Sequence, residues 1–322
     1  MAAMAKRERM EAVFAGKDVD RPPFSLWYHF GLQHGSGCDF ARAQRDFYEA
    51  YNLDWLKMMS DYPYPFPEGV SDCSTPESLM KLDRFDIEES PYQEQLAAWD
   101  MISKEIGDQA FCVDTVFNPW NVARRSLVKE KMASYMRDDP KTLHHALEVI
   151  TENMIAYCRS VIEHGADGLF ISVPASAEYV TYEQYQTFMK PYDIKLFQAV
   201  KAFAPVVIAH IHGNALYFID VIQTYPTDAI SWADRAAGPG LAETRQMYGG
   251  VLMGGIDHTD FGLTSISALQ AQALEAIRVG GNQRFILAPG CSIPTDTFPE
   301  VIRGVCAAAG INCDDRPLRV PC

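Results

Sequence analysis

Eight short apolar runs, separated by longer segments with helical periodicity, restrict the fold of this 322-residue chain more than any other feature. Strands that alternate with helices form parallel sheets, and eight such units in about 300 residues are typical of a (β/α)8 barrel. The runs are residues 24–30, 55–60, 110–117, 168–173, 206–212, 229–233, 251–256 and 285–288. We therefore predict an α/β protein with a single TIM-barrel domain over residues 1–322, including an N-terminal helix at 1–20 and a tail at 311–322.

Apolar residues recur at helical spacing over residues 92–106, 141–163, 182–203 and 264–279. Thr264 or Ser265 would cap the last of these helices, and Gly280-Gly281 would end it. Active sites of TIM barrels lie at the carboxyl ends of the strands. Polar side chains that directly follow the apolar runs are therefore the candidate functional residues.

The composition narrows the possible partners and location. The formal net charge of −14 disfavours nucleic acid and anionic membranes, which attract clustered Lys and Arg. No apolar segment is long enough to span a bilayer, and the charged residues 1–16 do not form a secretory signal. The eight cysteines contain no CxxC pair, so we expect reduced thiols and a cytoplasmic protein.

Two histidines and a cysteine stand at the ends of predicted strands. His210 and His212 close the run 206–212, and residues two apart on a strand point to the same side. Cys291 follows the last run. Imidazole and thiolate suit zinc, and three protein ligands with one open position are typical of catalytic zinc. Asp234 or Asp257 could be a fourth ligand or orient an imidazole. The alternative is a packed histidine and a cysteine that serves as a small apolar side chain.

Other polar and aromatic residues at strand ends are candidates for substrate binding. His29 follows the first run and Asp61 the second, where it could accept a substrate hydrogen bond or act as a base. Trp120 could stack on a planar substrate, and Tyr179 lies in the loop after the fourth run. The aromatic residues near the mouth would suit an aromatic substrate, although ordinary packing explains them equally well.

Several short motifs, in order along the chain, resemble the uroporphyrinogen decarboxylase superfamily over about residues 5–310. They are Arg21-Pro22-Pro23-Phe24, Gly165-Ala166-Asp167-Gly168, residues 185–192, residues 210–214, Gly254-Gly255-Ile256-Asp257 and residues 288–294. The resemblance implies a (β/α)8 barrel and a homodimer. It also implies an enzyme of one of two chemistries.

The first chemistry is metal-free decarboxylation. The decarboxylase binds carboxylates through an Arg-Gln-Ala-Gly-Arg stretch, but on alignment at Gly31 its arginines become Tyr28 and Leu32. Its histidine near the eighth strand becomes Cys291, and only Asp61 matches its key aspartate. The predicted mouth is not strongly basic, as a substrate with eight carboxylates would require. A decarboxylase or related lyase is therefore the alternative rather than the leading hypothesis.

The second chemistry is methyl transfer. This chain resembles zinc methyltransferases with a His-x-Cys…Cys motif, in which His210 matches the histidine and Cys291 the second cysteine, while His212 replaces the first. The resemblance implies transfer of a methyl group between a small substrate, an aromatic methyl ether or a thiol, and a separate corrinoid protein that carries cobalamin. His210, His212 and Cys291 would bind Zn²⁺.

The methyltransferase hypothesis gives roles to the remaining candidates. Asp257 or Asp234 would orient a ligand or move a proton, and Tyr28, His29 and Trp120 would shape the substrate pocket. A non-catalytic barrel would have lost its polar groups at the strand ends, which this chain retains.

Overall fold

The computed structural model describes residues 2–313, which form one parallel sheet with helices around it. The strands are hydrogen-bonded in chain order from β1 to β7. They are β1 Trp55–Met58, β2 Phe111–Phe117, β3 Gly168–Val173, β4 Val206–Ile211, β5 Ala229–Trp232, β6 Val251–Ile256 and β7 Phe285–Pro289. Seven of the eight predicted runs are therefore strands, with ends that differ by at most two residues. The parallel sheet curls as in a TIM-like barrel, as predicted.

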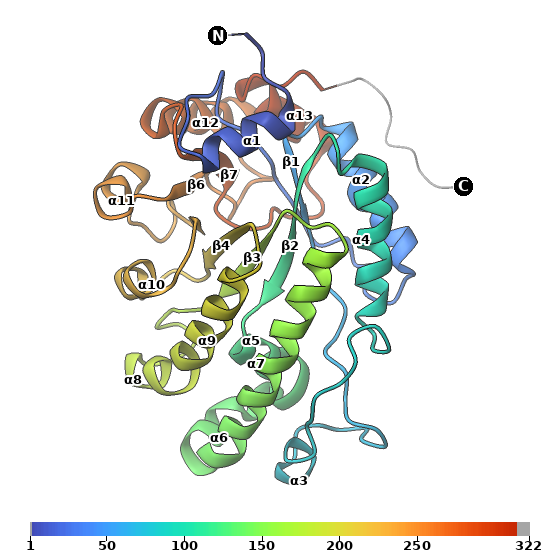
Figure 1. Ribbon diagram of the computed structural model, residues 1–322. Helices are drawn as coiled ribbons and strands as arrows, with labels where there is room; N and C mark the ends of the chain where they lie inside the picture. Colours follow the sequence, from blue (N-terminus) through green and yellow to red (C-terminus); the bar gives the residue numbers. More distant parts are fainter. Residues whose placement is uncertain (1, 314–322) are drawn as a thin grey trace.

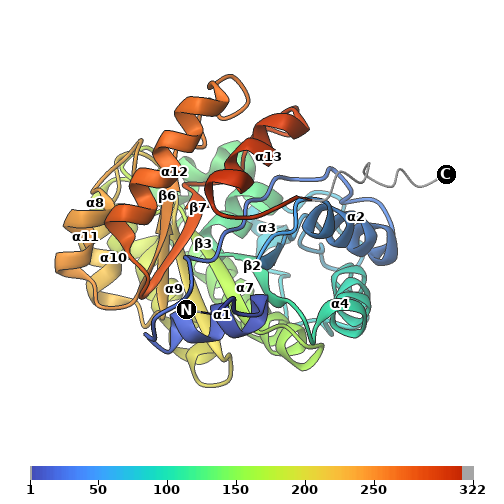
Figure 2. The same ribbon diagram turned by 90° about the horizontal axis from the view of Figure 1, so that it is seen from above.

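The helices lie outside the sheet (Figures 1 and 2). They are α1 Lys6–Phe14, α2 Gly37–Ala50, α3 Pro76–Leu79, α4 Gln93–Ile106, α5 Pro119–Val122, α6 Met132–Asp138, α7 Pro140–Glu163, α8 Tyr182–Gln184, α9 Lys190–Lys201, α10 Phe218–Thr224, α11 Leu241–Met247, α12 Ile266–Gly280 and α13 Pro299–Ala308. Two π-helical segments, η1 Ala123–Val128 and η3 Tyr185–Met189, and one 3₁₀ turn, η2 Lys129–Lys131, complete the elements. None of the helices within residues 2–313 has the length and apolar character needed to span a bilayer.

The N-terminal helix and one internal helix differ from the predictions. Helix α1 covers Lys6–Phe14 rather than 1–20, and residues 314–322 of the predicted tail lie outside the described part of the chain. The predicted helix 182–203 is divided into α8, the π-helical segment η3 and α9. The predicted cap is present at the start of α12, where the Ser265 hydroxyl accepts a hydrogen bond from the Ala268 N–H.

The predicted first strand, residues 24–30, is not a strand, and this prediction is wrong. The segment makes one parallel bridge, from Phe24 to Leu287 of β7. It also bonds to the residue before β1, because the Phe24 carbonyl accepts the Asp54 N–H at 3.0 Å. The segment thus lies between β7 and β1, where a TIM barrel has its remaining strand. Pro22 and Pro23 lack N–H groups, and the Phe24 N–H donates to the Asp54 carboxylate at 2.8 Å instead of to a strand.

The Asp54 carboxylate is the centre of a buried ionic cluster. Its side chain is 0% exposed and accepts hydrogen bonds from Arg9 Nη1 at 2.6 Å and from Arg21 Nη1 at 2.6 Å. Arg9 belongs to α1, so the cluster joins this helix to β1 and to the closing segment at Phe24. Each charge lies beside an opposite charge, which compensates for its loss of water.

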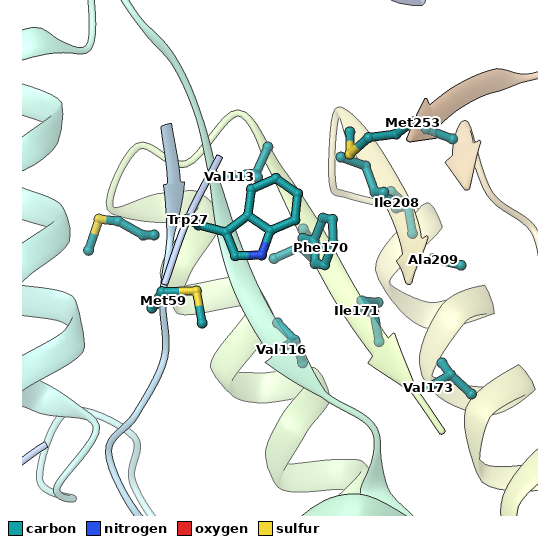
Figure 3. Packing of buried hydrophobic residues seen from close by; sticks show 14 of the residues in the cluster. Trp27, Met59, Val113, Val116, Phe170, Ile171, Val173, Ile208, Ala209 and Met253 are labelled. Atoms are coloured by element: carbon teal, nitrogen blue, oxygen red, sulfur yellow. The ribbon is translucent and has the colours of Figure 1, made fainter. Parts of the chain in front are cut away.

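The interior of the barrel is filled by apolar side chains (Figure 3). Every residue of β3, β4 and β6 is buried, because helices cover the outer face of the sheet and side chains fill its inner face. Trp27 of the closing segment packs edge-on against Phe170 of β3, with ring centroids 5.5 Å apart. In Figure 1, β2 runs toward α5, at the end of the molecule opposite to α1. The carboxyl ends of the strands, and the polar residues that follow them, face that end.

The first prediction concerns barrel closure. Asp54→Asn leaves the partly buried Arg21 without its counter-charge and the buried Arg9 with Asp20 alone, and it should lower the free energy of unfolding by about 3 kcal/mol. Urea denaturation followed by circular dichroism measures the change. Asp138→Asn is the control, because Asp138 pairs with Arg137 at the surface and should have no measurable effect. Equal stability of the two variants would contradict the role given to Asp54.

Candidate active site

His210 and His212 stand at the end of β4 with their rings 5.6 Å apart. His210 is 4% exposed, stacks on Phe170 at 5.2 Å and has its Nδ1 3.2 Å from the Ser231 hydroxyl. Burial, together with the nearby Lys57 charge, lowers the pKa of His210 to about 3. The ring is therefore neutral at physiological pH, which is the form that binds metal ions.

Cys291 follows β7 and faces the two histidines. Its Sγ lies 3.7 Å from His212 Nδ1. Burial tends to raise the pKa of the Cys291 thiol, but the hydrogen bond and charge of His212 and the contacts with Ser292 outweigh it and lower this pKa below its usual value. The ligand atoms of His210, His212 and Cys291 all lie within 4.8 Å of one another. Zinc would need them roughly 3.3–3.6 Å apart, given its bond lengths, so modest side-chain rotations suffice.

Asp234 and Asp257 are not part of this cluster. Asp234 is buried and accepts the Gly255 N–H at 2.9 Å, and burial raises its pKa to about 6. Asp257 accepts the Thr259 N–H at 2.9 Å within its own turn. Neither residue lines the cavities beside the histidines. Both carboxylates bind backbone amides instead, so the expectation that one of them reaches the cluster is corrected.

His258 is a residue that the sequence reasoning missed. It lines a cavity of about 110 Å³ together with His210, His212 and Cys291. Its Nδ1 is buried without a hydrogen-bond partner, and burial lowers the pKa of the ring. A signal was available, because His258 stands two residues after β6 just as Cys291 stands two residues after β7. His258 therefore occupies the place beside the cluster that was expected for Asp257.

A second cavity, of about 200 Å³, adjoins the cluster on the side of β1 and β2. Its walls include Trp27, His29 and Lys57, as well as His210 and Cys291. Tyr28 does not line it and packs against Phe30 and Phe47, because neighbouring residues of an extended segment point to opposite sides. The sequence interpretation placed Tyr28 in the substrate pocket, whereas Trp27 lines this cavity in the structure.

The other predicted pocket residues lie around this cavity. His29 lines it, and its Nδ1 is 2.6 Å from Asp61 Oδ1. Asp61 itself does not line the cavity. Trp120 and Tyr179 line a neighbouring hollow of about 550 Å³, and the Tyr179 ring stacks on His212 with centroids 6.0 Å apart. The structure therefore gathers His29, Tyr179 and the three proposed ligands, with Trp120 and Asp61 farther out.

Lys57 is the second residue that the sequence reasoning missed. It belongs to β1, is 3% exposed and points into the barrel, where its Nζ donates to Thr115 Oγ1 at 2.8 Å. Burial lowers the pKa of Lys57 to about 7, against smaller opposing effects of the charges on Cys291, Asp61 and Asp114. The signal was a lysine within the apolar run Trp55-Leu56-Lys57-Met58. Lysine is almost never fully buried unless its charge is paired, so a lysine in an apolar run marks a candidate functional residue.

The second prediction tests the contact between His212 and Cys291. The hydrogen bond favours the thiolate, so His212→Ala should raise the pKa of Cys291, lower the thiolate fraction at neutral pH and slow alkylation by iodoacetamide. Mass spectrometry of peptides from chelator-treated protein measures the rate at Cys291. The exposed Cys38 is the internal control and should react equally in both proteins. An unchanged rate at Cys291 would show that His212 does not act on it.

Comparisons with known proteins identify methyltransferases as relatives of this chain. Methylcobamide:CoM methyltransferase MtaA of Methanosarcina barkeri is 23% identical over 249 residues, which cover 76% of this chain and 69% of the relative. Methylated-thiol–coenzyme M methyltransferase of Methanosarcina mazei is 26% identical over 187 residues, which cover 56% of this chain and 47% of the relative. The chain thus spans about half to two thirds of the length of these relatives.

A solved structure has the same fold. It is a methyltransferase from Methanosarcina mazei, which matches with a TM-score of 0.74 and 20% identity over 95% of this chain and 98% of that chain. The family model for uroporphyrinogen decarboxylase (URO-D) matches residues 61–310, more than half of the sequence. The chain therefore belongs to the uroporphyrinogen decarboxylase family, and its curated relatives include methyltransferases that act on methylcobamides and coenzyme M.

Proposed function

We propose that this protein is a zinc-dependent methyltransferase that moves a methyl group between a small substrate and a separate corrinoid protein. The convergence of His210, His212 and Cys291 is the observation that carries the proposal. Two imidazoles and one thiolate form a donor set that zinc prefers over magnesium or calcium, and they leave one position open. The names of the methyltransferase relatives support the chemistry and the corrinoid partner.

The residues around the three ligands fit this role. Ser231 and Phe170 contact the His210 ring, and Tyr179 stacks on the His212 ring, so both imidazoles are held close to the directions that an ion would need. A zinc ion bound there would withdraw charge from the heteroatom that gains or loses the methyl group. His258, with its free and buried Nδ1, can accept or return a proton beside the cluster.

The substrate side of the proposal is a thiol or an aromatic methyl ether. The second cavity has room for a small molecule next to Cys291, and Trp27, Phe117 and Phe170 supply aromatic walls. Cobalamin would arrive on a separate corrinoid protein, and we expect the enzyme to form a homodimer, as the family resemblance implies. The decarboxylase alternative depends on Asp61, whose carboxylate is bonded to His29 and does not line this cavity.

The third prediction concerns metal content. Protein purified without added metal should contain about one zinc ion per chain, and Cys291→Ser should lose it. Inductively coupled plasma mass spectrometry measures the metal. Cys38→Ser is the matched control, because this exposed thiol lies outside the cluster. The site would be refuted by wild-type protein that contains no zinc and takes up none after reduction and addition of zinc.

The fourth prediction separates ligand chemistry from folding at residue 212. His212→Ala should lose zinc and methyl transfer, whereas His212→Cys should retain zinc, because a thiolate replaces the imidazole. Zinc content, thermal unfolding and methyl transfer from methylcobalamin are measured for both variants. Full methyl transfer by His212→Ala would contradict the role of His212 as a ligand.

A further inference from the structure

We propose that Cys306 and Cys313 are a redox-sensitive modification site, at which a low-molecular-weight disulfide such as oxidised glutathione joins the two side chains in an intrachain disulfide. Cys306 belongs to α13, which lies at the α1 end of the molecule (Figure 1). The candidate metal cluster lies at the opposite end, so the inference does not rest on methyl transfer. Six residues separate the two cysteines, which is why the absence of a CxxC pair did not reveal them.

The two thiols point at the same backbone oxygen. Cys306 Sγ donates to the Tyr51 carbonyl oxygen at 3.7 Å, and Cys313 Sγ donates to the same oxygen at 3.4 Å. The Cys313 side chain is also in hydrogen-bond contact with the Cys306 thiol. Rotation of the two side chains therefore suffices to bring the sulfurs to the S–S bond length of about 2.05 Å.

The chain reversal after α13 keeps the two cysteines together before any bond forms. The Ile311 N–H donates to the Cys306 carbonyl at 2.8 Å, and Gly310 has a φ of +74°, as in the Schellman ending of a helix. The Asn52 side chain then donates to the Asn312 carbonyl at 2.9 Å, which fixes the residue before the second cysteine. The backbone is therefore already arranged for the crosslink.

The turn between the cysteines covers part of the Asp54 cluster. A β-carbon at Gly310 would lie 3.2 Å from Arg21 Cδ, so the turn packs directly on this arginine. Arg21 pairs with Asp54 at 2.6 Å, and the Asp54 charge also acts on Cys306. A disulfide at this place would fasten the turn that covers the ion pair of the barrel closure. Oxidation should therefore stabilise the fold.

Exposure and pKa determine which cysteine reacts first. Cys313 is partly exposed, whereas Cys306 is buried. The hydrogen bond with Cys313, together with burial, raises the pKa of the Cys306 thiol well above its usual value. The thiolate is the reactive form, so Cys313 is the thiol that meets the oxidant and Cys306 the one that completes the bond.

The reaction takes two exchange steps. The Cys313 thiolate attacks one sulfur of the oxidant R–S–S–R, which forms a mixed disulfide and releases one R–S⁻. Cys306 then loses its proton, and its thiolate attacks the Cys313 sulfur, so that the protein disulfide forms and the second R–S⁻ leaves. The two cysteines give up two electrons and two protons, which convert the oxidant into two molecules of R–SH. The mixed disulfide also removes the Cys313 thiol that raises the pKa of Cys306, which favours the second step.

Peptide mapping after mild oxidation tests the proposal. Folded protein is incubated with oxidised glutathione, denatured, treated with N-ethylmaleimide to block remaining thiols, and digested with trypsin without reduction. Both cysteines fall in one peptide, residues 304–319, because trypsin does not cleave between Arg316 and Pro317. We expect this peptide to lose two hydrogens and to carry neither glutathione nor maleimide.

Thermal unfolding measures the effect on the fold. Oxidation should raise the midpoint of wild-type protein by about 3 °C, because the crosslink restricts the unfolded chain, and dithiothreitol should reverse the rise. Cys313→Ser treated in the same way should show no such rise. An equal rise in this variant would refute the stabilising role of the disulfide.

Two single variants separate the exchange steps. After oxidation, Cys306→Ala should retain glutathione on Cys313, whereas Cys313→Ser should leave the buried Cys306 unmodified. Circular dichroism confirms that each variant is folded. Cys38→Ser is the control, because this exposed cysteine lies outside the pair and its loss should leave the disulfide in residues 304–319 unchanged.

The exposed Cys38 of wild-type protein also shows whether the oxidant was active. If Cys38 carries glutathione while residues 304–319 retain two maleimide-labelled cysteines, or carry glutathione on both, the proposal is overturned. A disulfide from either cysteine to Cys322 would overturn it as well, and would be recognised as a bond between two tryptic peptides.

Discussion

The buried Asp54 carboxylate is the interaction on which the barrel and its site depend. It binds Arg9, Arg21 and the Phe24 N–H, and so fixes the segment that lies between β7 and β1. That segment carries Trp27 and His29 to the cavity. Its Trp27 carbonyl also accepts the Ile293 N–H at 2.9 Å, which fixes the loop that contains Cys291. Barrel closure and the position of the candidate metal ligand are thus parts of one hydrogen-bonded arrangement.

Desolvation determines the electrostatics of the site. Burial disfavours the charged form of His210 and of Lys57, and lowers their pKa values to about 3 and about 7. The neutral imidazole of His210 can bind a metal ion. Lys57 is divided between its charged and neutral forms near neutral pH. Cys291 departs from this trend, because its contact with His212 favours the thiolate despite burial.

Aromatic residues at the mouth have a role that differs from the one expected. The sequence suggested that Trp120 stacks on a planar substrate and that Tyr179 is a substrate-binding residue. In the structure they flank the Arg124 guanidinium, and Tyr179 also stacks on His212. They therefore hold the charged groups and a candidate ligand in place. Aromatic substrate contacts would come from Trp27, Phe117 and Phe170 in the adjoining cavity.

The local sequence was sufficient to predict most strands and the three residues of the candidate metal cluster. The strands of a parallel barrel are easy to recognise in the sequence, because they are buried on both faces and appear as continuous apolar runs. His210 and His212 share a strand face by their spacing, and Cys291 lies at the same end of the barrel once parallel strands are assumed. These inferences depend only on residues that are close in sequence, or on the rule that all strands of a parallel barrel end on the same side.

The tertiary structure alone decided where single polar groups find their partners. Phe24 does not belong to a regular strand, because its N–H donates to the Asp54 carboxylate, thirty positions away. Asp234 and Asp257 accept hydrogen bonds from backbone amides. The buried Nδ1 of His258 has no hydrogen-bond partner beside the cluster. The cavity of about 200 Å³ is lined by Lys57, Arg124 and Arg125 because β1 and the segment after β2 bring these residues together. Burial and pairing depend on contacts between distant segments, and no local pattern in the chain records them.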